Sequence, residues 1–547
     1  MSTAELNAYE RDWSARTGLV GDAANPRPLG HSLEYAAKLL ETGQPTDVER
    51  AGRIIEAVCA LQKLEPSWKF GQFPIRSDLQ YHDRNSNLFL LPDMAEVLRR
   101  HAQRLPPPTV KRLRDCFRRG MSFAERRWDE EVFDLHRDGK AYTNIFLLYI
   151  RAMFLGGVVE CEERLWRKGE GQWRRWFNHV SSYGIDEFCS PTYSHVDYEA
   201  LAHVLRMARD EAMRGEVRMA LDYLFAMQFA ATHPVLEVPV CGSSRDYRRY
   251  WQPGEGRPLL AGVADNESYA VPEAIRHEFA NREFPFQMSG RATSVPFRFR
   301  TWQEEDAGLG TLTGGHYFPQ NIHCAAAVGR SAAEREVLCL PGRHCFQSGF
   351  TAQAGMQALC FFTSAPNSYV RTQYIRPDAA IGKLHADWPL ALGVTPGWEE
   401  VERKPGRLTL RAYGRDAHLR CFTLADGKPE PVEVERMRMN GYQREIDVYA
   451  FPPEASNVLC VVGLTAAKKR FSPSGPSVKR RGGVTEISSG KLAVRLFEHA
   501  TGELTELYDE DWRTTPLLEC PSMELRPGEL AARAANEFAA VRKVDQV

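Results

Sequence analysis

The stretch TDVERAGRIIEAVCALQ, residues 46–62, decides the fold class of the first half of the chain. Its apolar residues recur with the period of an α-helix and fall on one face, which is the pattern of an amphipathic helix packed against a core. Thr46 and Glu49 have the spacing of a capping box at a helix N-terminus. The stretch therefore predicts a helix that begins at Thr46.

The same helical period extends from about residue 30 to residue 235. Further helices are predicted within 91–105, 109–128, 142–166, 169–184, 196–213 and 215–231. Pro92 stands near the start of the first of these, and short polar links join them. Helices of this number and length predict a bundle, a solenoid or a ring of helix pairs.

After about residue 280 the pattern changes to short runs with period two, bounded by Gly, Pro, Asp and Asn. Such runs occupy 407–414, 417–424, 431–439, 445–451, 457–465 and 491–509. The last run predicts a hairpin that turns through Ala500, Thr501 and Gly502. Many strands without intervening helices predict antiparallel sheets packed as a sandwich. The expected domains are therefore residues 1–250, a linker with cleft loops over 251–285, and a β domain over 286–547.

Composition limits the possible functions. The chain has 547 residues, 43% of them hydrophobic and 26% charged, and a net charge of −1, so no overall field attracts nucleic acid or an anionic membrane. An anionic ligand must be held by a local basic site. The twelve cysteines lack the spacing of a disulfide framework or a zinc site, and we expect most to be reduced and buried.

Location can be judged only from the ends and the apolar runs. The N-terminus shows no export signal, which predicts a cytoplasmic protein, or a secreted or periplasmic one if the sequence is a mature form. The most apolar run, NIFLLYIRAMFLGGVV, contains Arg151 and is too short to span a bilayer. It predicts a buried helix.

Four short polar segments interrupt the helical half. They are YHDRNSN (81–87), KAYTN (140–144), SPTYSH (190–195) and SSRDY (243–247). Each lies at a predicted helix end or in a loop, where functional side chains are usually presented, and Pro191 should break any helix through the third. In a ring of helix pairs, all four could converge at one end of the central cavity.

In its architecture and in the order of these segments, the sequence resembles the polysaccharide lyases that join an (α/α) toroid, an incomplete barrel of helix pairs, to an antiparallel β-sandwich. This family includes hyaluronate, chondroitin and xanthan lyases, with alginate and heparin lyase relatives. The resemblance matches Asn144, Tyr193 and Arg245 to the family's Asn, Tyr and Arg. In hyaluronate-type members a catalytic histidine precedes the tyrosine by about two helical turns. That region here holds Tyr183 and Gly184 instead.

The resemblance implies a β-elimination on a uronic-acid glycan, without a metal or another cofactor. Asn144 and Arg245 would neutralise the substrate carboxylate, and Tyr193 would remove the C5 proton. The proton donor to the leaving oxygen would be Tyr193 itself, Tyr247 or His195, and His82 is a further candidate for the missing histidine. Residues expected to contact the sugar are Tyr81, His82, Arg84, Asn85, Glu187, Trp251 and His316.

Simpler interpretations stay open. Asn144 is also a preferred helix cap, Tyr193 a packed turn residue, His195 a helix-start residue, and Arg245 a surface partner of Asp246. In the β half, His316, His323, His344, Cys324 and Cys345 are potential metal ligands, but they lack a tight motif, so we predict no metal site.

Two other functions remain alternatives. A glycoside hydrolase on a similar toroid would use paired carboxylates, for which Asp83, Glu187, Asp197 and Asp246 are candidates. A non-catalytic glycan-binding protein could keep the same fold. In each case the expected partner is an acidic polysaccharide or oligosaccharide, with no nucleic acid and no membrane.

Overall fold

The computed structural model describes residues 3–22, 25, 27–78, 81, 83–129, 143–190, 193–244, 269–292, 297–314, 321–341, 348–363, 390–440, 445–452, 455, 457–469, 471, 473, 475–500, 504–507, 514–521 and 523–534. These residues fall into two compact units. The first comprises residues 1–177 with 206–208, and the second comprises 178–205 with 209–547. The division falls inside two helices rather than at the change from helices to strands.

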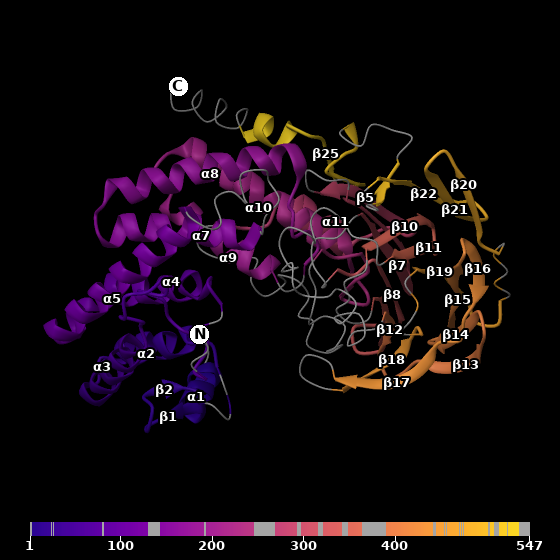
Figure 1. The fold of residues 1–547 in the computed structure, drawn as a ribbon. Helices are drawn as coiled ribbons and strands as arrows, with labels where there is room; N and C mark the ends of the chain where they lie inside the picture. Colours follow the sequence, from indigo (N-terminus) through magenta and orange to yellow (C-terminus); the bar gives the residue numbers. More distant parts are fainter. Residues whose placement is uncertain are drawn as a thin grey trace. The chain divides into compact units, whose positions relative to one another are not determined.

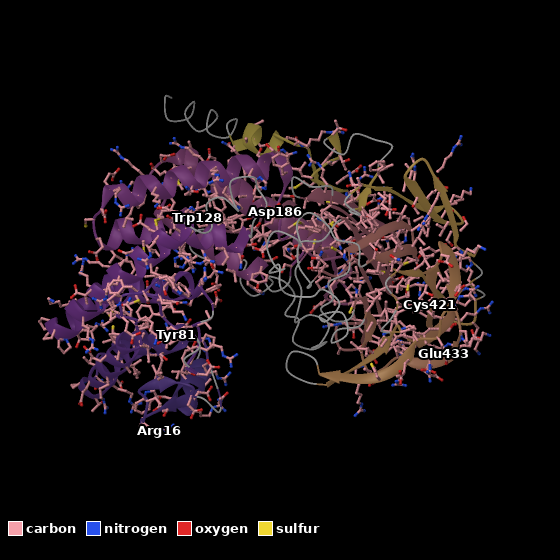
Figure 2. The ribbon with its side chains drawn as sticks, viewed as in Figure 1. Arg16, Tyr81, Trp128, Asp186, Cys421 and Glu433 are labelled. Atoms are coloured by element: carbon pink, nitrogen blue, oxygen red, sulfur yellow. The ribbon has the colours of Figure 1, made fainter. Side chains whose placement is uncertain are left out.

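The first unit is helical (Figure 1). Its elements are α1 Thr3–Asp12, α2 Gly30–Thr42, α3 Pro45–Ala60, α4 Ser86–Arg100, η1 Ala102–Arg104, α5 Pro107–Arg127, α7 Thr143–Val159, most of α8 Glu163–Tyr183, and the short hairpin β1 Trp13–Ser14 and β2 Leu19–Val20. Helix α2 packs on α3, and α4 packs on both α5 and α7. Buried Trp128 stacks on Tyr149 of α7 with ring centroids 4.2 Å apart (Figure 2).

Helix α7 confirms the prediction of a buried helix, because nearly all of its residues are buried. Within the described residues, no helix combines the length and the apolar character needed to span a bilayer. Arg151, the one charge in this helix, donates from Nη2 to Leu88 O at 3.4 Å. In a regular helix the N–H of residue 92 would donate to Leu88 O, four residues earlier. Pro92 has no N–H, so this helical bond is missing. The proline in α4 and the arginine in α7 therefore compensate for each other in part.

Several predicted helix boundaries are wrong. Helix α3 begins at Pro45 with Gln44 as N-cap and no side-chain cap bond, so the predicted capping box of Thr46 and Glu49 does not form. Proline is well suited to the first turn, which places Thr46 already inside the helix. Helix α4 begins at Ser86, so Pro92 lies in its interior. The predicted helix over 142–166 is two helices, because α7 ends at Val159 and α8 starts at Glu163.

Within the described residues, the second unit holds three further helices and most of the strands. The helices are α9 Ser194–Met207, except for its last two residues, α10 Glu211–Ala231 and α11 Glu273–Ala280. No helix runs through 184–190, as expected for the segment before Pro191. Helix α11 lies in the segment predicted to be linker and was not anticipated.

Every strand pair is antiparallel, and three sheets dominate (Figure 1). In spatial order, the ten-stranded sheet comprises β17 Glu435–Asn440, β18 Glu445–Ala450, β12 Ala391–Val394, β9 Arg335–Leu340, β8 Cys324–Gly329, β7 Ala307–Thr313, β6 Phe297–Glu304, β5 Phe286–Ala292, β24 Leu518–Cys520 and β25 Met523–Leu525. The seven-stranded sheet comprises β10 Ser348–Ala354, β11 Gln357–Thr363, β19 Asn457–Ala466, β15 Arg415–Ala425, β14 Arg407–Ala412 and β13 Glu399–Lys404, with β16 Lys428–Pro431 paired to β15. The four-stranded sheet comprises β20 Ser477–Arg481, β21 Val484–Ser489, β22 Leu492–Glu498 and β23 Leu504–Glu506, and a small hairpin joins β3 Thr232–His233 to β4 Val238–Pro239.

One hydrophobic cluster takes side chains from both larger sheets, including β7, β8 and β9 on one side and β11, β15 and β19 on the other. Cys360, Cys460 and Cys421 pair directly across β11, β19 and β15 within this core (Figure 2 labels Cys421). Burial raises the pKa of the Cys460 thiol. The described cysteines are free and mostly buried, which confirms the expectation from sequence.

The predicted change from a helical half to a half of antiparallel strands is confirmed. The strand pairing of the predicted final hairpin is confirmed, because β22 and β23 pair antiparallel with Glu498 opposite Leu504, whereas Thr501 and Gly502 of its predicted turn lie outside the described residues. The strands between residues 286 and 394 were not assigned individually from the sequence. The predicted domain limits, the toroid and the sandwich stay predictions.

Candidate functional site

Tyr193 and His195 lie at the start of α9 in the second unit, and both side chains are half-buried. Ser190 holds the turn before the helix, because its Oγ accepts from Tyr193 N at 3.1 Å and its carbonyl accepts from Ser194 N at 3.0 Å. Tyr193 O then accepts from Asp197 N at 2.9 Å, which begins the helix. These bonds tie Tyr193 and Ser194 to Ser190, and the side chains of Tyr193 and His195 stay partly accessible.

Helix α10 anchors this turn. Gln228 of α10 donates from Nε2 to Ser194 Oγ at 2.6 Å, and both residues are buried. One turn further along α9, Tyr198 packs edge-on against Phe225 of α10, with ring centroids 5.5 Å apart. A buried hydrogen bond and an aromatic contact thus fix α9 on α10 on either side of His195.

The segment between α8 and α9 is buried from residue 184 to residue 190. Burial raises the pKa of Asp186 (labelled in Figure 2), whose Oδ2 lies 3.1 Å from His179 Nε2. Glu187 is fully buried, with 0% of its surface exposed. Cys189 has a left-handed backbone with φ of +48°, a conformation that costs energy for a residue with a side chain and that is often found at functional sites.

The segment that leads into Arg245 lies against this same region. Ser244 donates to Phe188 O from its backbone N at 3.4 Å and from its Oγ at 3.3 Å. Ser243 forms an antiparallel bridge with Ile322 that holds the segment from the other side. Predicted site residues Arg245, Tyr247 and Trp251 lie outside the described residues, as does Asp246.

Asn144 belongs to the first unit, at the second residue of α7, and is 1% exposed. Its Oδ1 accepts from Ile145 N at 2.7 Å. Because α7 begins at Thr143, Asn144 lies inside the first turn, and the simpler interpretation of Asn144 as the helix cap is wrong.

Tyr81 and Arg84 lie in a basic aromatic surface of the first unit that the sequence did not reveal in full. Arg84 Cζ lies 4.3 Å from the ring centroid of Trp68, a side chain that is 47% exposed. Lys69 Nζ lies 5.1 Å from the same ring, and Lys63 Nζ lies 4.5 Å from the ring of Tyr81. We call these five residues the Trp68 surface.

The Tyr81 hydroxyl is not directed to a ligand. It donates to Leu61 O at 2.5 Å, and burial raises the pKa of the phenol (Figure 2). Any contribution of Tyr81 to sugar binding would therefore come from its ring. The signal for Trp68 in the sequence was a tryptophan beside a lysine in the polar loop EPSWKFG.

The rest of the YHDRNSN cluster is largely structural. Ser86 Oγ donates to Phe73 O at 2.6 Å, and Asn87 Nδ2 donates to Gly71 O at 2.9 Å and Gly120 O at 3.1 Å. Asn85 precedes α4 without a side-chain cap bond. His82 lies outside the described residues.

Of the potential metal ligands in the β half, His323 and Cys324 lie within the described residues. His323 is 1% exposed, its Nδ1 donates to Leu312 O at 3.0 Å, and burial lowers its pKa to about 4. His316, His344 and Cys345 lie outside the described residues. Across the described residues, no group of three or more His, Cys, Asp or Glu side chains is arranged to hold a metal ion.

Comparisons with known proteins add no assignment. No protein-family model matches the sequence, and the search of curated proteins gave no match.

Proposed function

We propose that the protein is a polysaccharide lyase that cleaves a uronic-acid glycan by β-elimination. The proposal includes the finer architecture, an (α/α) toroid followed by a β-sandwich. Packing of successive helices such as α2 on α3 and α4 on α5 supports the toroid, and the core shared by the two larger sheets supports the sandwich.

The observation that carries the proposal is the arrangement around Phe188. The turn that presents Tyr193 begins two residues after Phe188, and the residue before Arg245 is hydrogen-bonded to Phe188 O. Ser244 and Phe188, 56 positions apart in sequence, are thus hydrogen-bonded neighbours. Tyr193 follows Phe188 by five residues in the sequence, and Arg245 follows Ser244 directly.

Each group has a role in the elimination. A phenol normally titrates near 10, and a nearby guanidinium favours the phenolate, so Tyr193 can act as a base at working pH. Tyr193 would remove the C5 proton while Arg245 stabilises the charge that develops on the carboxylate. The C4–O4 bond then breaks, a C4–C5 double bond forms, and the leaving oxygen takes a proton from His195, Tyr193 or Tyr247. Asn144 as a second carboxylate neutraliser remains a prediction from the sequence.

The hydrolase alternative has less support. Its carboxylates must reach the glycosidic oxygen and a water molecule. Of the candidate carboxylates, Glu187 and Asp197 are 0% and 1% exposed, Asp83 is half-buried like Tyr193 and His195, and Asp246 lies outside the described residues. The burial of Glu187 and Asp197 argues against these two as the catalytic pair.

A substrate screen tests the proposal. The purified protein is incubated with alginate, glucuronan, hyaluronan, chondroitin and heparin, and ultraviolet absorbance and reducing ends are both recorded. A lyase product absorbs through its C4–C5 double bond, so both signals should rise together for at least one polymer. Reducing ends without absorbance would identify a hydrolase, and binding without either signal would identify a glycan-binding protein.

A further inference from the structure

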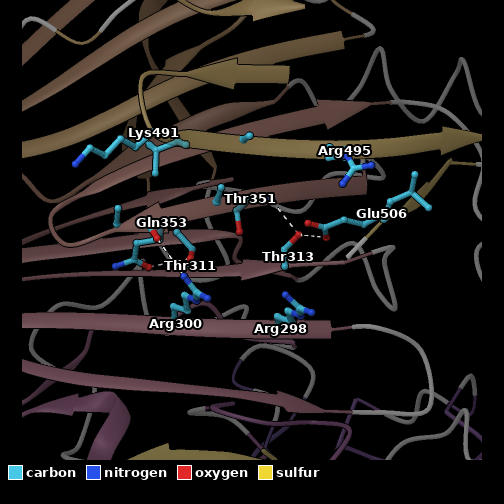
Figure 3. Close-up of a pocket in the computed structure, with 14 residues that line it drawn as sticks. Arg298, Arg300, Thr311, Thr313, Thr351, Gln353, Lys491, Arg495 and Glu506 are labelled. Atoms are coloured by element: carbon cyan, nitrogen blue, oxygen red, sulfur yellow. Dashed lines mark hydrogen bonds between the residues drawn. The ribbon is translucent and has the colours of Figure 1, made fainter. Parts of the chain in front are cut away.

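A pocket in the second unit lies where the three larger sheets meet. It is a cavity of about 500 Å³ lined by residues of β6, β7, β10 and β22, by Lys491 just before β22, by Glu506 of β23 and by the following Leu507 (Figure 3). Strand β10 packs on β7 and on β22, which brings edges of the three sheets together. None of its lining residues is one of the proposed catalytic residues.

The lining is strongly basic. Among its described residues it holds four cationic side chains, Arg298, Arg300, Lys491 and Arg495, against one carboxylate, Glu506. Arg298 and Arg300 rise from β6 on one side, and Arg495 reaches in from β22 on the opposite side (Figure 3). Neither Arg300 nor Lys491 has an ion-pair partner within the described part of the chain. Since the whole chain carries a net charge of −1, this concentration of positive charge is local.

Hydrogen bonds order the floor of the pocket. Thr311 Oγ1 donates to Gln353 Oε1 at 2.8 Å, and Gln353 Nε2 donates to Leu309 O at 2.8 Å. Thr313 Oγ1 accepts from Thr351 N at 3.0 Å and donates to Glu506. The floor is therefore a fixed polar surface rather than a set of mobile side chains.

The positive charges are spread along the strands. Arg298 and Arg300 stand two residues apart on one face of β6, which places their Cα atoms about 7 Å apart. Arg300 and Lys491 lie towards one end of the pocket, and Arg495 and Glu506 lie towards the other (Figure 3). A small anion such as phosphate would meet only part of this array, whereas a linear ligand with several anionic groups would meet all of it.

The lining also limits the kind of polyanion. None of its described residues is aromatic, so the bases of a single-stranded nucleic acid would find no ring to stack on. The threonine oxygens of the floor keep lone pairs that can accept from a ligand rich in hydroxyl groups. We propose that this pocket is a second, non-catalytic binding site for an acidic oligosaccharide, whose carboxylates pair with Arg300, Lys491 and the neighbouring arginines. The ligand class rests on the proposed function, but the binding does not require elimination.

Calorimetric titration tests the site in a Tyr193→Phe background, which prevents turnover. The ligands are hexasaccharides of glucuronate, galacturonate and mannuronate, with cellohexaose as the neutral counterpart and inorganic phosphate as the small anion. We expect at least one uronate hexamer to bind and its affinity to fall with added salt. In Arg300→Gln/Lys491→Gln its affinity should fall at least about tenfold, because two charge-assisted contacts are lost.

The matched control is Lys479→Gln/Arg480→Gln, which removes two exposed cations from β20 of the same four-stranded sheet as β22. The affinity of this control variant for the hexamer should stay within about twofold of that of the Tyr193→Phe protein, as expected for the loss of exposed surface charges. The proposal is overturned if no uronate hexamer binds, if cellohexaose binds equally well, if phosphate at equal concentration displaces the hexamer, or if the pocket variant binds like the control. A wild-type protein that binds through this pocket but forms no unsaturated product would refute the lyase proposal alone.

Discussion

His323 and His233 are the residues whose protonation should control stability in acid. Burial lowers the pKa of each to about 4, from an ordinary value of 6.5. In the unfolded chain both would take up protons below pH 6.5, whereas the folded protein holds them neutral down to about pH 4. The contribution of these two histidines to the free energy of unfolding is therefore fully present above pH 6.5. It is lost as the pH falls from 6.5 to about 4.

When the pH is lowered from 7 to 5, the free energy of unfolding should fall by about 2 kcal/mol for each of the two histidines. Urea unfolding at the two pH values measures the change. In His323→Gln, the protein should be less stable at pH 7 but should lose less on going to pH 5. The exposed His499→Gln serves as control and should keep the wild-type difference. If His323→Gln loses as much stability between pH 7 and pH 5 as the wild type does, the lowered pKa of His323 is contradicted.

Trp68 is the residue whose loss should weaken substrate binding without affecting the chemical step. Its ring is 47% exposed and carries Arg84 and Lys69 over it, so the three side chains together offer apolar surface and positive charge to an acidic sugar. In Trp68→Ala, KM for the acidic polymer should rise about threefold to tenfold and kcat should change little. Steady-state kinetics by ultraviolet absorbance measure both.

The control for Trp68 is Val401→Ala, which removes another exposed apolar side chain, on β13. Its KM should match the wild type. If Trp68→Ala also keeps the wild-type KM, the Trp68 surface does not contact the substrate.

Among the helices and strands, α10 is central to the proposed site because it holds the Tyr193 turn through Gln228. Its own N-terminus is fixed by Asp210, whose Oδ1 accepts from Met213 N at 2.7 Å. Asp210→Ala removes this cap and should lower the free energy of unfolding by about 1 kcal/mol. Asp210→Asn keeps an accepting oxygen, and its free energy of unfolding should fall by only a few tenths of a kcal/mol.

Urea unfolding of the two Asp210 variants at pH 7 measures this difference. If Asp210→Ala and Asp210→Asn are equally stable, the side-chain bond does not stabilise α10. The comparison does not depend on the proposed function, because Asp210 belongs neither to the turn nor to the pocket.

Local patterns predicted the elements better than their ends. The apolar period of 46–62 identified α3, but Pro45 in the first turn rather than Thr46 set its start. Pro92 was expected near a helix start, yet α4 continues through it, and Arg151 from another helix donates to Leu88 O, the carbonyl left without its helical partner. Such compensation joins residues 63 positions apart, and no local pattern contains it.

Across the chain, the change from helical to alternating periodicity predicted where sheets replace helices. The contact of Ser244 with Phe188, which supports the proposed site, joins residues 56 positions apart and could not be predicted from spacing. The basic pocket did leave a signal, because FRFRTW places Arg298 and Arg300 on one face of a strand. That alternation is also typical of an ordinary half-exposed strand, and only the packing of three sheets separates the two interpretations.

The decisive measurement is the initial rate of ultraviolet absorbance increase on the best uronate polymer for the wild type, Tyr193→Phe and Tyr183→Phe. Tyr183 is an exposed tyrosine in the same unit, so its variant controls for loss of a phenol hydroxyl elsewhere. We predict that Tyr183→Phe keeps the wild-type rate and that Tyr193→Phe loses at least about 100-fold, since it lacks the proposed base. A Tyr193→Phe rate within a few-fold of wild type would contradict the mechanism.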